Sequence, residues 1–201
     1  MPFKAISCLA GVLLSWSQNA AAIDRSAKYQ LHIRTGVIQG AYSGASIESR
    51  SFMVPTSVDL EVEAFVDRDE AFTLRAIMAM EMSNNRVNYT YAGAGKTYYL
   101  GARGRKELKS EKAVQISMIP KTRYYWGYSA GIAQVLAIPF GLVLSAYSTT
   151  IDASVGSGVI YQITPNMGIE GHFGIGMGYG FSTVTVTGTT MRALVGVTYF
   201  F

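Results

Sequence analysis

Residues 167–201 carry the feature that most constrains the fold, an alternation of apolar with small or polar side chains. Between 167 and 181 the odd positions are large and apolar except Gly171, and the even positions are glycine, Glu170 or His172. Successive side chains of a β-strand point to opposite faces, so this pattern predicts a strand with one apolar face. Residues 190–201 repeat it and end with Tyr199 and Phe201 on the apolar face.

The amino terminus predicts export. A basic start is followed by an apolar run over residues 5–16 and by small residues up to Ala22, as in a secretory signal peptide. We expect residues 1–22 to be removed by cleavage after Ala22, which leaves residues 23–201 as one domain. The run is too short for a membrane anchor, and Cys8 is too early for a lipid anchor. Without Cys8 the chain has no thiol, which excludes disulfides and Cys-ligated metals.

Six further segments alternate with a period of two residues. We predict strands over residues 29–37, 58–66, 72–81, part of 87–104, 124 to about 134, and 151–163. Polar turns over residues 67–70, 83–86 and 164–166 separate neighbouring strands, and the charged residues 105–112 are expected to form a further turn.

The stretch from residue 124 to 147 is uncharged and is long enough for a transmembrane helix. Pro139 and several glycines argue against a helix. We therefore expect a strand followed by an apolar loop or a further strand. The apolar residues within 129–147, from Ser129 to Tyr147, form a patch that contacts either lipid or a second copy of the chain. A homo-oligomer through this segment is one hypothesis, and a plain lipid-facing strand is the other.

Unpaired strand edges cannot exist in hydrocarbon, so the strands must close on themselves. The sequence predicts an all-β fold, a closed antiparallel up-and-down transmembrane β-barrel of eight strands. Ten strands result if residues 113–119 and 140–147 both pair.

The leader, the alternating segments and the aromatic end resemble a small Gram-negative outer-membrane β-barrel protein. The resemblance implies Sec-type export, an outer-membrane location and both termini in the periplasm. It also implies that Tyr199 and Phe201 form an insertion signal for the barrel-insertion machinery.

The inward faces of these strands carry most of the ionisable groups. An eight-stranded barrel is just wide enough for its side chains, and buried ions persist when they are paired. We therefore expect a polar lumen network, in which Arg34 and Arg75 flank the acidic strand between them. Its expected members are His32, Arg34, Asp59, Glu61, Glu63, Arg75, Glu170, His172 and Arg192, with Glu81, Arg103 and Asp152 as further inward candidates. A catalytic or transport site is the alternative interpretation.

Two adjacent strands lack large inward side chains in the outer half of the lumen. One has glycines at 174, 176, 178 and 180, and the other has Ser154, Gly156 and Gly158. Large residues of the far wall, such as Phe65 and Tyr99, are expected to fill this space, or the glycines serve to ease strand curvature. A ligand pocket open to the outside is the alternative.

No metal, cofactor or catalytic residue is predicted. His32 and His172 are far apart in the chain and lack a second ligand at metal spacing, and no serine stands in a nucleophile motif. The net charge of +4 comes without a basic helix, so we expect attraction to outer-membrane lipid and no nucleic-acid partner.

The function expected is a non-enzymatic structural or interaction role in the outer membrane. A transporter or a barrel that binds a small or lipidic ligand is the alternative, followed by an outer-membrane lipid-modifying enzyme.

Overall fold

A computed structural model describes residues 29–44, 47–67, 69–81, 86–100, 106–109, 115–118, 121–137, 146–164, 166–181 and 185–201. The predicted leader, residues 1–22, lies outside the described residues. So do Cys8, the predicted cleavage site, most of the turn 83–86 and Arg103.

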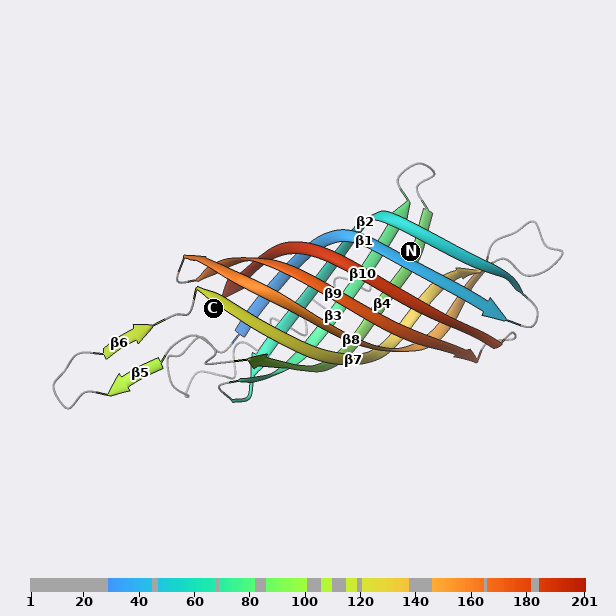
Figure 1. Cartoon of the computed structure of the whole chain (residues 1–201). Helices are drawn as coiled ribbons and strands as arrows, with labels where there is room; N and C mark the ends of the chain where they lie inside the picture. The colour runs from blue at the N-terminus through green and yellow to red at the C-terminus, as the bar shows by residue number, and fades with distance from the viewer. Residues whose placement is uncertain are drawn as a thin grey trace.

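The described chain forms a closed barrel of eight antiparallel strands, in the order β1-β10-β9-β8-β7-β4-β3-β2 (Figure 1). Two short strands, β5 and β6, pair with each other in a separate sheet. The bounds are β1 Tyr29–Gly44, β2 Ile47–Phe65, β3 Glu70–Glu81, β4 Arg86–Leu100, β5 Lys106–Lys109, β6 Gln115–Met118, β7 Thr122–Ala137, β8 Ala146–Thr164, β9 Met167–Phe181 and β10 Thr185–Phe200. The predicted eight-stranded up-and-down barrel is confirmed.

Three sequence expectations about the middle of the chain need correction or restriction. Residues 106–109, expected in a turn, form β5, which pairs with β6 outside the barrel, so the ten-stranded alternative is wrong. Residues 122–137 form strand β7, so the helix alternative is wrong there. Of the expected interface 129–147, residues 129–137 and 146–147 belong to β7 and β8, and residues 138–145 lie outside the described residues.

Within the described part of the chain, no helix is long and apolar enough to cross a membrane.

The barrel closes between its first and last strands. Tyr29 and Phe201 exchange backbone hydrogen bonds of 3.2 and 3.1 Å, and β1 and β10 pair from Gln30↔Phe200 to Gly44↔Val186. Tyr29 and Phe201, the first and last described residues, therefore lie at one end of the barrel, which we call the terminal end. The long connection 101–121 also leaves β4 at the terminal end, although outer-membrane barrels usually carry their long loops at the other end.

A bulge on β2 changes the register opposite Gly36 and Ile38 of β1. Gly36 has φ +153°, a region that favours glycine, and its carbonyl oxygen accepts a 2.7 Å hydrogen bond from Ser57 Oγ. The bulge shifts the inward positions of β2 by one residue, so that Val54, which precedes the charged run, lies inside the barrel.

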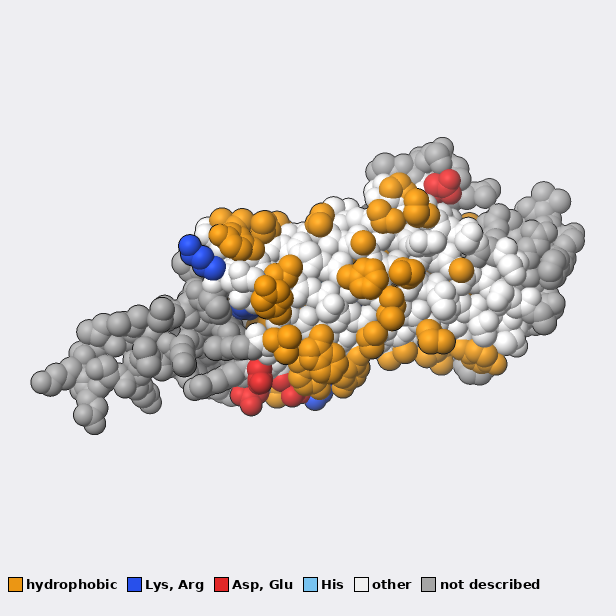
Figure 2. All heavy atoms as spheres, in the orientation of Figure 1, with side chains coloured by type: hydrophobic (Ala, Val, Ile, Leu, Met, Phe, Trp, Pro, Cys, Tyr) orange, Lys and Arg blue, Asp and Glu red, His pale blue; other side chains and the backbone are white. Residues whose placement is uncertain are grey.

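The strands alternate as predicted between a lipid-facing and a lumen-facing side. Large apolar side chains such as Ile33, Ile175 and Met177 are exposed on the wall, while their neighbours His32, Arg34 and Gly176 face inward. Figure 2 shows the apolar side chains distributed over the outer wall, as a transmembrane barrel requires.

Candidate functional site

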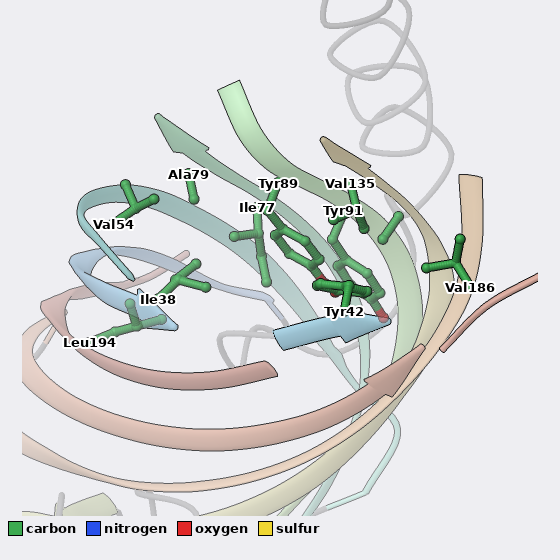
Figure 3. Close-up of a cluster of buried hydrophobic side chains, with 11 residues drawn as sticks. Ile38, Tyr42, Val54, Ile77, Ala79, Tyr89, Tyr91, Val135, Val186 and Leu194 are labelled. Atoms are coloured by element: carbon green, nitrogen blue, oxygen red, sulfur yellow. The ribbon is translucent and has the colours of Figure 1, made fainter. Parts of the chain in front are cut away.

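The lumen contains a charged layer between two apolar clusters. At the terminal end, Tyr99, Tyr125 and Ile160 pack together with Phe65 against them. Toward the opposite end lies a larger cluster that includes Tyr42, Tyr89 and Tyr91, whose side chains point into the barrel (Figure 3). The ion-paired groups around Arg34 lie between these clusters, whereas Arg123 lies at the start of β7, near the terminal end.

The large cluster corrects the expectation about which residues fill the outer half of the lumen. Phe65 and Tyr99 lie near the terminal end instead. The rings of Phe52 and Tyr42 cover Gly40 and Gly188, where an added Cβ would overlap them. Glycine is required at these positions because the aromatic rings lie directly on the backbone. Filling of the lumen was therefore predicted correctly, but the filling residues were not.

Arg34 is the centre of the charged layer. Its guanidinium lies 3.2 Å from Asp59, 2.8 Å from Glu61 and 2.9 Å from Glu170, and its side chain is fully buried. The first two carboxylates come from the neighbouring strand β2, and Glu170 comes from β9 beyond β10. Arg34 of β1 thus links β2, on one side of its own strand, with β9, which lies beyond β10 on the other side.

Arg75 approaches the same carboxylates from β3. Its Nε donates to Asp59 Oδ1 at 3.0 Å and lies 3.4 Å from Glu61, and its Nη2 also contacts Asp59. Asp59 and Glu61 are therefore shared by two arginines. This arrangement offsets the cost of burying carboxylates in a narrow lumen.

A hydrogen-bond chain extends from Arg75 to Glu170. Arg75 Nη2 lies 3.2 Å from His172 Nε2, His172 Nδ1 lies 2.9 Å from Tyr125 Oη, and Tyr125 Oη donates to Glu170. Since Arg75 can only donate and the Tyr125 proton goes to Glu170, His172 accepts at Nε2 and donates from Nδ1. This hydrogen-bond pattern leaves one proton on the His172 ring, which is the neutral form.

His32 lies between two carboxylates. Its Nδ1 is 2.6 Å from Glu170 Oε2, and its Nε2 is 3.3 Å from Glu63 Oε2. Tyr99 Oη donates a 2.5 Å hydrogen bond to the same Glu63 oxygen. The spacing along the sequence indicated no second ligand for either histidine, but the fold brings Glu63 of β2 and Glu170 of β9 to His32.

Charge counting supports an imidazolium at His32. Among the described buried side chains, five carboxylates (Asp59, Glu61, Glu63, Asp152, Glu170) face four arginines (Arg34, Arg75, Arg123, Arg192). A protonated His32 makes the buried set neutral, and its two carboxylate neighbours favour that form.

His32, Glu61 and Glu63 each offer an oxygen or nitrogen within 4.8 Å of the others, a spacing that could suit a metal ion. Each of these side chains already has a partner on at least one atom, and His32 Nε2 lies 3.3 Å from Glu63 Oε2. Glu61 is bound by Arg34, Glu63 by Tyr99, and the Nδ1 atom of His32 faces Glu170. The chemistry of this group is therefore ion pairing, since metal binding would require these partners to leave.

Arg192 lies at the border between the charged layer and the large apolar cluster. It is 1% exposed, and its Nε lies beside Gly174, where an added Cβ would be 3.5 Å away. Nearby, Asp152 accepts hydrogen bonds from Tyr89 at 3.0 Å and Thr150 at 2.5 Å. Glycine on β9 thus provides the space for a guanidinium.

Arg123 is a buried lumen residue that sequence reasoning missed. It is 2% exposed, its guanidinium carbon lies 4.3 Å from the ring centre of Phe200 and 5.3 Å from that of Tyr99, and its Nη1 donates to Gln30 at 3.5 Å. Tyr125, which joins Glu170 to His172, was missed as well. Both lie in phase with the inward side of β7, so the alternation of that strand contains the signal.

The remaining expected residues lie at the barrel rims. Glu81 ends β3, with Asn88 Nδ2 3.5 Å away. Tyr199 and Phe201 are exposed on the outer wall, and Phe201 stacks on Tyr29 and Tyr199 with ring centres 5.9 and 6.2 Å apart.

One internal cavity of about 20 Å³ touches the charged layer, with Glu61, Arg75, Tyr125 and His172 in its lining. This volume suits a single water molecule and is too small for a solute or a lipid chain. This cavity therefore gives a solute no access to the charged layer.

No family model and no curated protein sequence matches the chain. Its structure is similar to Neisserial surface protein A, NspA, with a TM-score of 0.57 and 15% identity over 86% of this chain and 97% of that one. The chain has the fold of a small outer-membrane β-barrel.

Two further barrels align less closely. The N-terminal β-barrel domain of Pseudomonas aeruginosa OprF has a TM-score of 0.49 at 12% identity, over 86% of this chain and 97% of that one. The outer membrane protease OmpT of Escherichia coli has a TM-score of 0.46 at 9% identity, over 90% and 99%. At these identities the similarity describes the fold and leaves activity to be argued from the site.

Proposed function

We propose that this protein is a closed, non-enzymatic outer-membrane barrel with a structural or interaction role. The observation that carries the proposal is the filled lumen, in which an ion-pair layer lies between two apolar clusters. A solute would have to break buried ion pairs in order to pass. The outer wall and the ends of the barrel are therefore the surfaces available to partners.

The same filling argues against a catalytic role. His32 and His172 are 0% and 7% exposed, and both are held by carboxylate, tyrosine or arginine partners. A general base must reach the proton that it removes, directly or through one water molecule. A substrate would have to displace these buried partners in order to reach either imidazole.

The proposed location is the outer membrane, reached by Sec-type export and cleavage near Ala22. The barrel-insertion machinery would read the exposed aromatic end, Tyr199 and Phe201, and outer-membrane lipid would cover the apolar wall. A homo-oligomer through residues 129–147 remains part of this proposal.

Planar-bilayer recordings of the purified barrel test the closed lumen. We expect no stable solute-sized conductance in membranes where a general porin, reconstituted in parallel, conducts. Stable conductance steps from correctly folded protein would overturn the proposal in favour of a transporter.

Incubation with labelled phospholipid and lipopolysaccharide tests the absence of enzymatic activity. We expect the lipids to be recovered unchanged. Turnover that disappears in folded His172→Gln protein would show that the barrel is an enzyme.

A further inference from the structure

A groove of about 670 Å³ runs across the outer wall from β4 to β10. It exists because small residues lie between large ones in the paired rows of the wall. Ser157 lies between Trp126 and Phe173, and Gly171 lies between Val159 and Val195. The groove is on the membrane side, and its lining also includes inward residues of the same strands, among them Tyr125 and His172.

Packing does not require glycine at position 171. A Cβ there would meet only Val159 Cγ1, at 3.9 Å, an ordinary contact. By contrast, a Cβ at Gly174 on the inward face of the same strand would come 3.3 Å from His172 Nε2. The other outward residues of β9 from Met167 to Tyr179 are all large and apolar. The hollow at Gly171 is therefore a feature of the wall that the fold itself does not demand.

The groove begins at an aromatic rim near the terminal end. Leu100, the last residue of β4, and Tyr124, near the start of β7, line it there, whereas Val195 lies further along β10. Beside it Trp126 stacks on Tyr98, with ring centres 4.7 Å apart. Tyrosine and tryptophan rings of this kind lie at the level of lipid head groups.

A cation lies at the same end of the barrel. Lys121 is exposed immediately before β7, three residues from Tyr124. The groove therefore joins a cationic, aromatic rim to an apolar hollow that extends toward the middle of the wall. This order of chemistry matches a phospholipid, with its phosphate at the rim and an acyl chain in the hollow.

We propose that the wall groove binds one acyl chain of an anionic phospholipid from the leaflet at the terminal end, with the head group near Lys121. The site extends the proposed interaction role, because a closed barrel can bind lipid only on its wall. A basic residue near an anionic lipid contributes about 1 kcal/mol, which is about a fivefold preference.

Trp126 provides the measurement. The chain has two tryptophans, and Trp16 lies in the predicted leader, so Trp126 is the sole expected fluorophore of its kind in the mature protein. The barrel is reconstituted in phosphatidylcholine vesicles that contain a small fraction of phosphatidylglycerol brominated on its acyl chains. We expect Trp126 quenching to show about fivefold preference for this lipid over brominated phosphatidylcholine at the same fraction.

Gly171→Leu should remove this preference by filling the hollow, and Ala92→Leu should retain it. Ala92 is exposed on the wall of β4, so Ala92→Leu places the same leucine side chain on the wall but outside the groove. Heat-modifiable gel migration establishes that both variants are folded.

Quenching in proportion to the lipid fraction, or unchanged preference in Gly171→Leu, would overturn the proposal. The proposal would also be overturned if quenching of the parent protein weakened as the protein density in the vesicles rose, while quenching of Gly171→Leu did not. That result would show that a second barrel, and not a lipid, occupies the groove. None of these outcomes depends on conductance, so the closed lumen is tested separately.

Discussion

Replacing Arg34 with methionine tests whether the ion-pair layer stabilises the barrel. The change removes the only cation that contacts Asp59, Glu61 and Glu170 together among the described ion pairs. Loss of one partner from a buried ion pair costs about 3–5 kcal/mol. Asp59 and Glu61 keep Arg75, and Glu170 keeps His32, so we expect the lower half of that range.

Lys96→Met is the matched control. Lys96 Nζ lies 2.5 Å from Glu70 on the outer wall, and its side chain is 42% exposed. An exposed ion pair of this kind contributes about 0–1 kcal/mol. The two variants remove the same charge from similar contacts in different surroundings, and therefore isolate the effect of burial.

Equilibrium urea unfolding in phospholipid vesicles, followed by Trp126 fluorescence and gel migration, gives the free energy of unfolding. Arg34→Met should lower it by about 3–4 kcal/mol, and Lys96→Met by less than about 1 kcal/mol. Adding Glu61→Gln to Arg34→Met should restore part of the loss, because it removes one uncompensated carboxylate. If Arg34→Met costs no more than Lys96→Met, or if the double variant is no better than the single one, the reasoning is refuted.

Three further predictions concern assembly, facing and association. Deletion of Phe201 should lower outer-membrane levels and leave protease-sensitive periplasmic chain; normal yield of heat-modifiable barrel would disprove the insertion signal. Ile175→Arg should lower the free energy of unfolding in bilayers by about 2–4 kcal/mol, against about 0–1 kcal/mol for Thr187→Arg near the rim. A spin label at 175 that reports water would show that this side chain faces the lumen and not the lipid. Leu142→Cys should give disulfide-linked dimers in native membranes if residues 129–147 form an interface, whereas labelling only by lipid-soluble reagents at every protein density would support a lipid-facing segment.

The alternation of side chains could be predicted from the sequence because it is a local property. It identified the membrane-facing side of each barrel strand, and the need to pair every strand edge in lipid led to a closed barrel. The same alternation placed Asp59, Glu61 and Glu63 on one inward face between Arg34 and Arg75, because neighbouring strands in an up-and-down barrel are also neighbours in the chain.

Contacts across the lumen had no such local signal. His32 and Glu170 belong to strands separated by β10, and their 2.6 Å contact depends on how the closed barrel sets the register of three strands. The short strand β5 was missed because charged residues dominate it. Strand β6 lies within 113–119, which the sequence indicated as a possible strand, but it pairs with β5 and not with the barrel.

The sequence by itself determined the class of fold and which side of each strand meets lipid, because both follow from a period of two residues and from the backbone's need for hydrogen bonds. Only the tertiary structure decided which residues fill the lumen, that Tyr125 joins Glu170 to His172, and that Gly171 lies over free space. These properties depend on distances between residues remote in the chain, and closure of the barrel determines those distances.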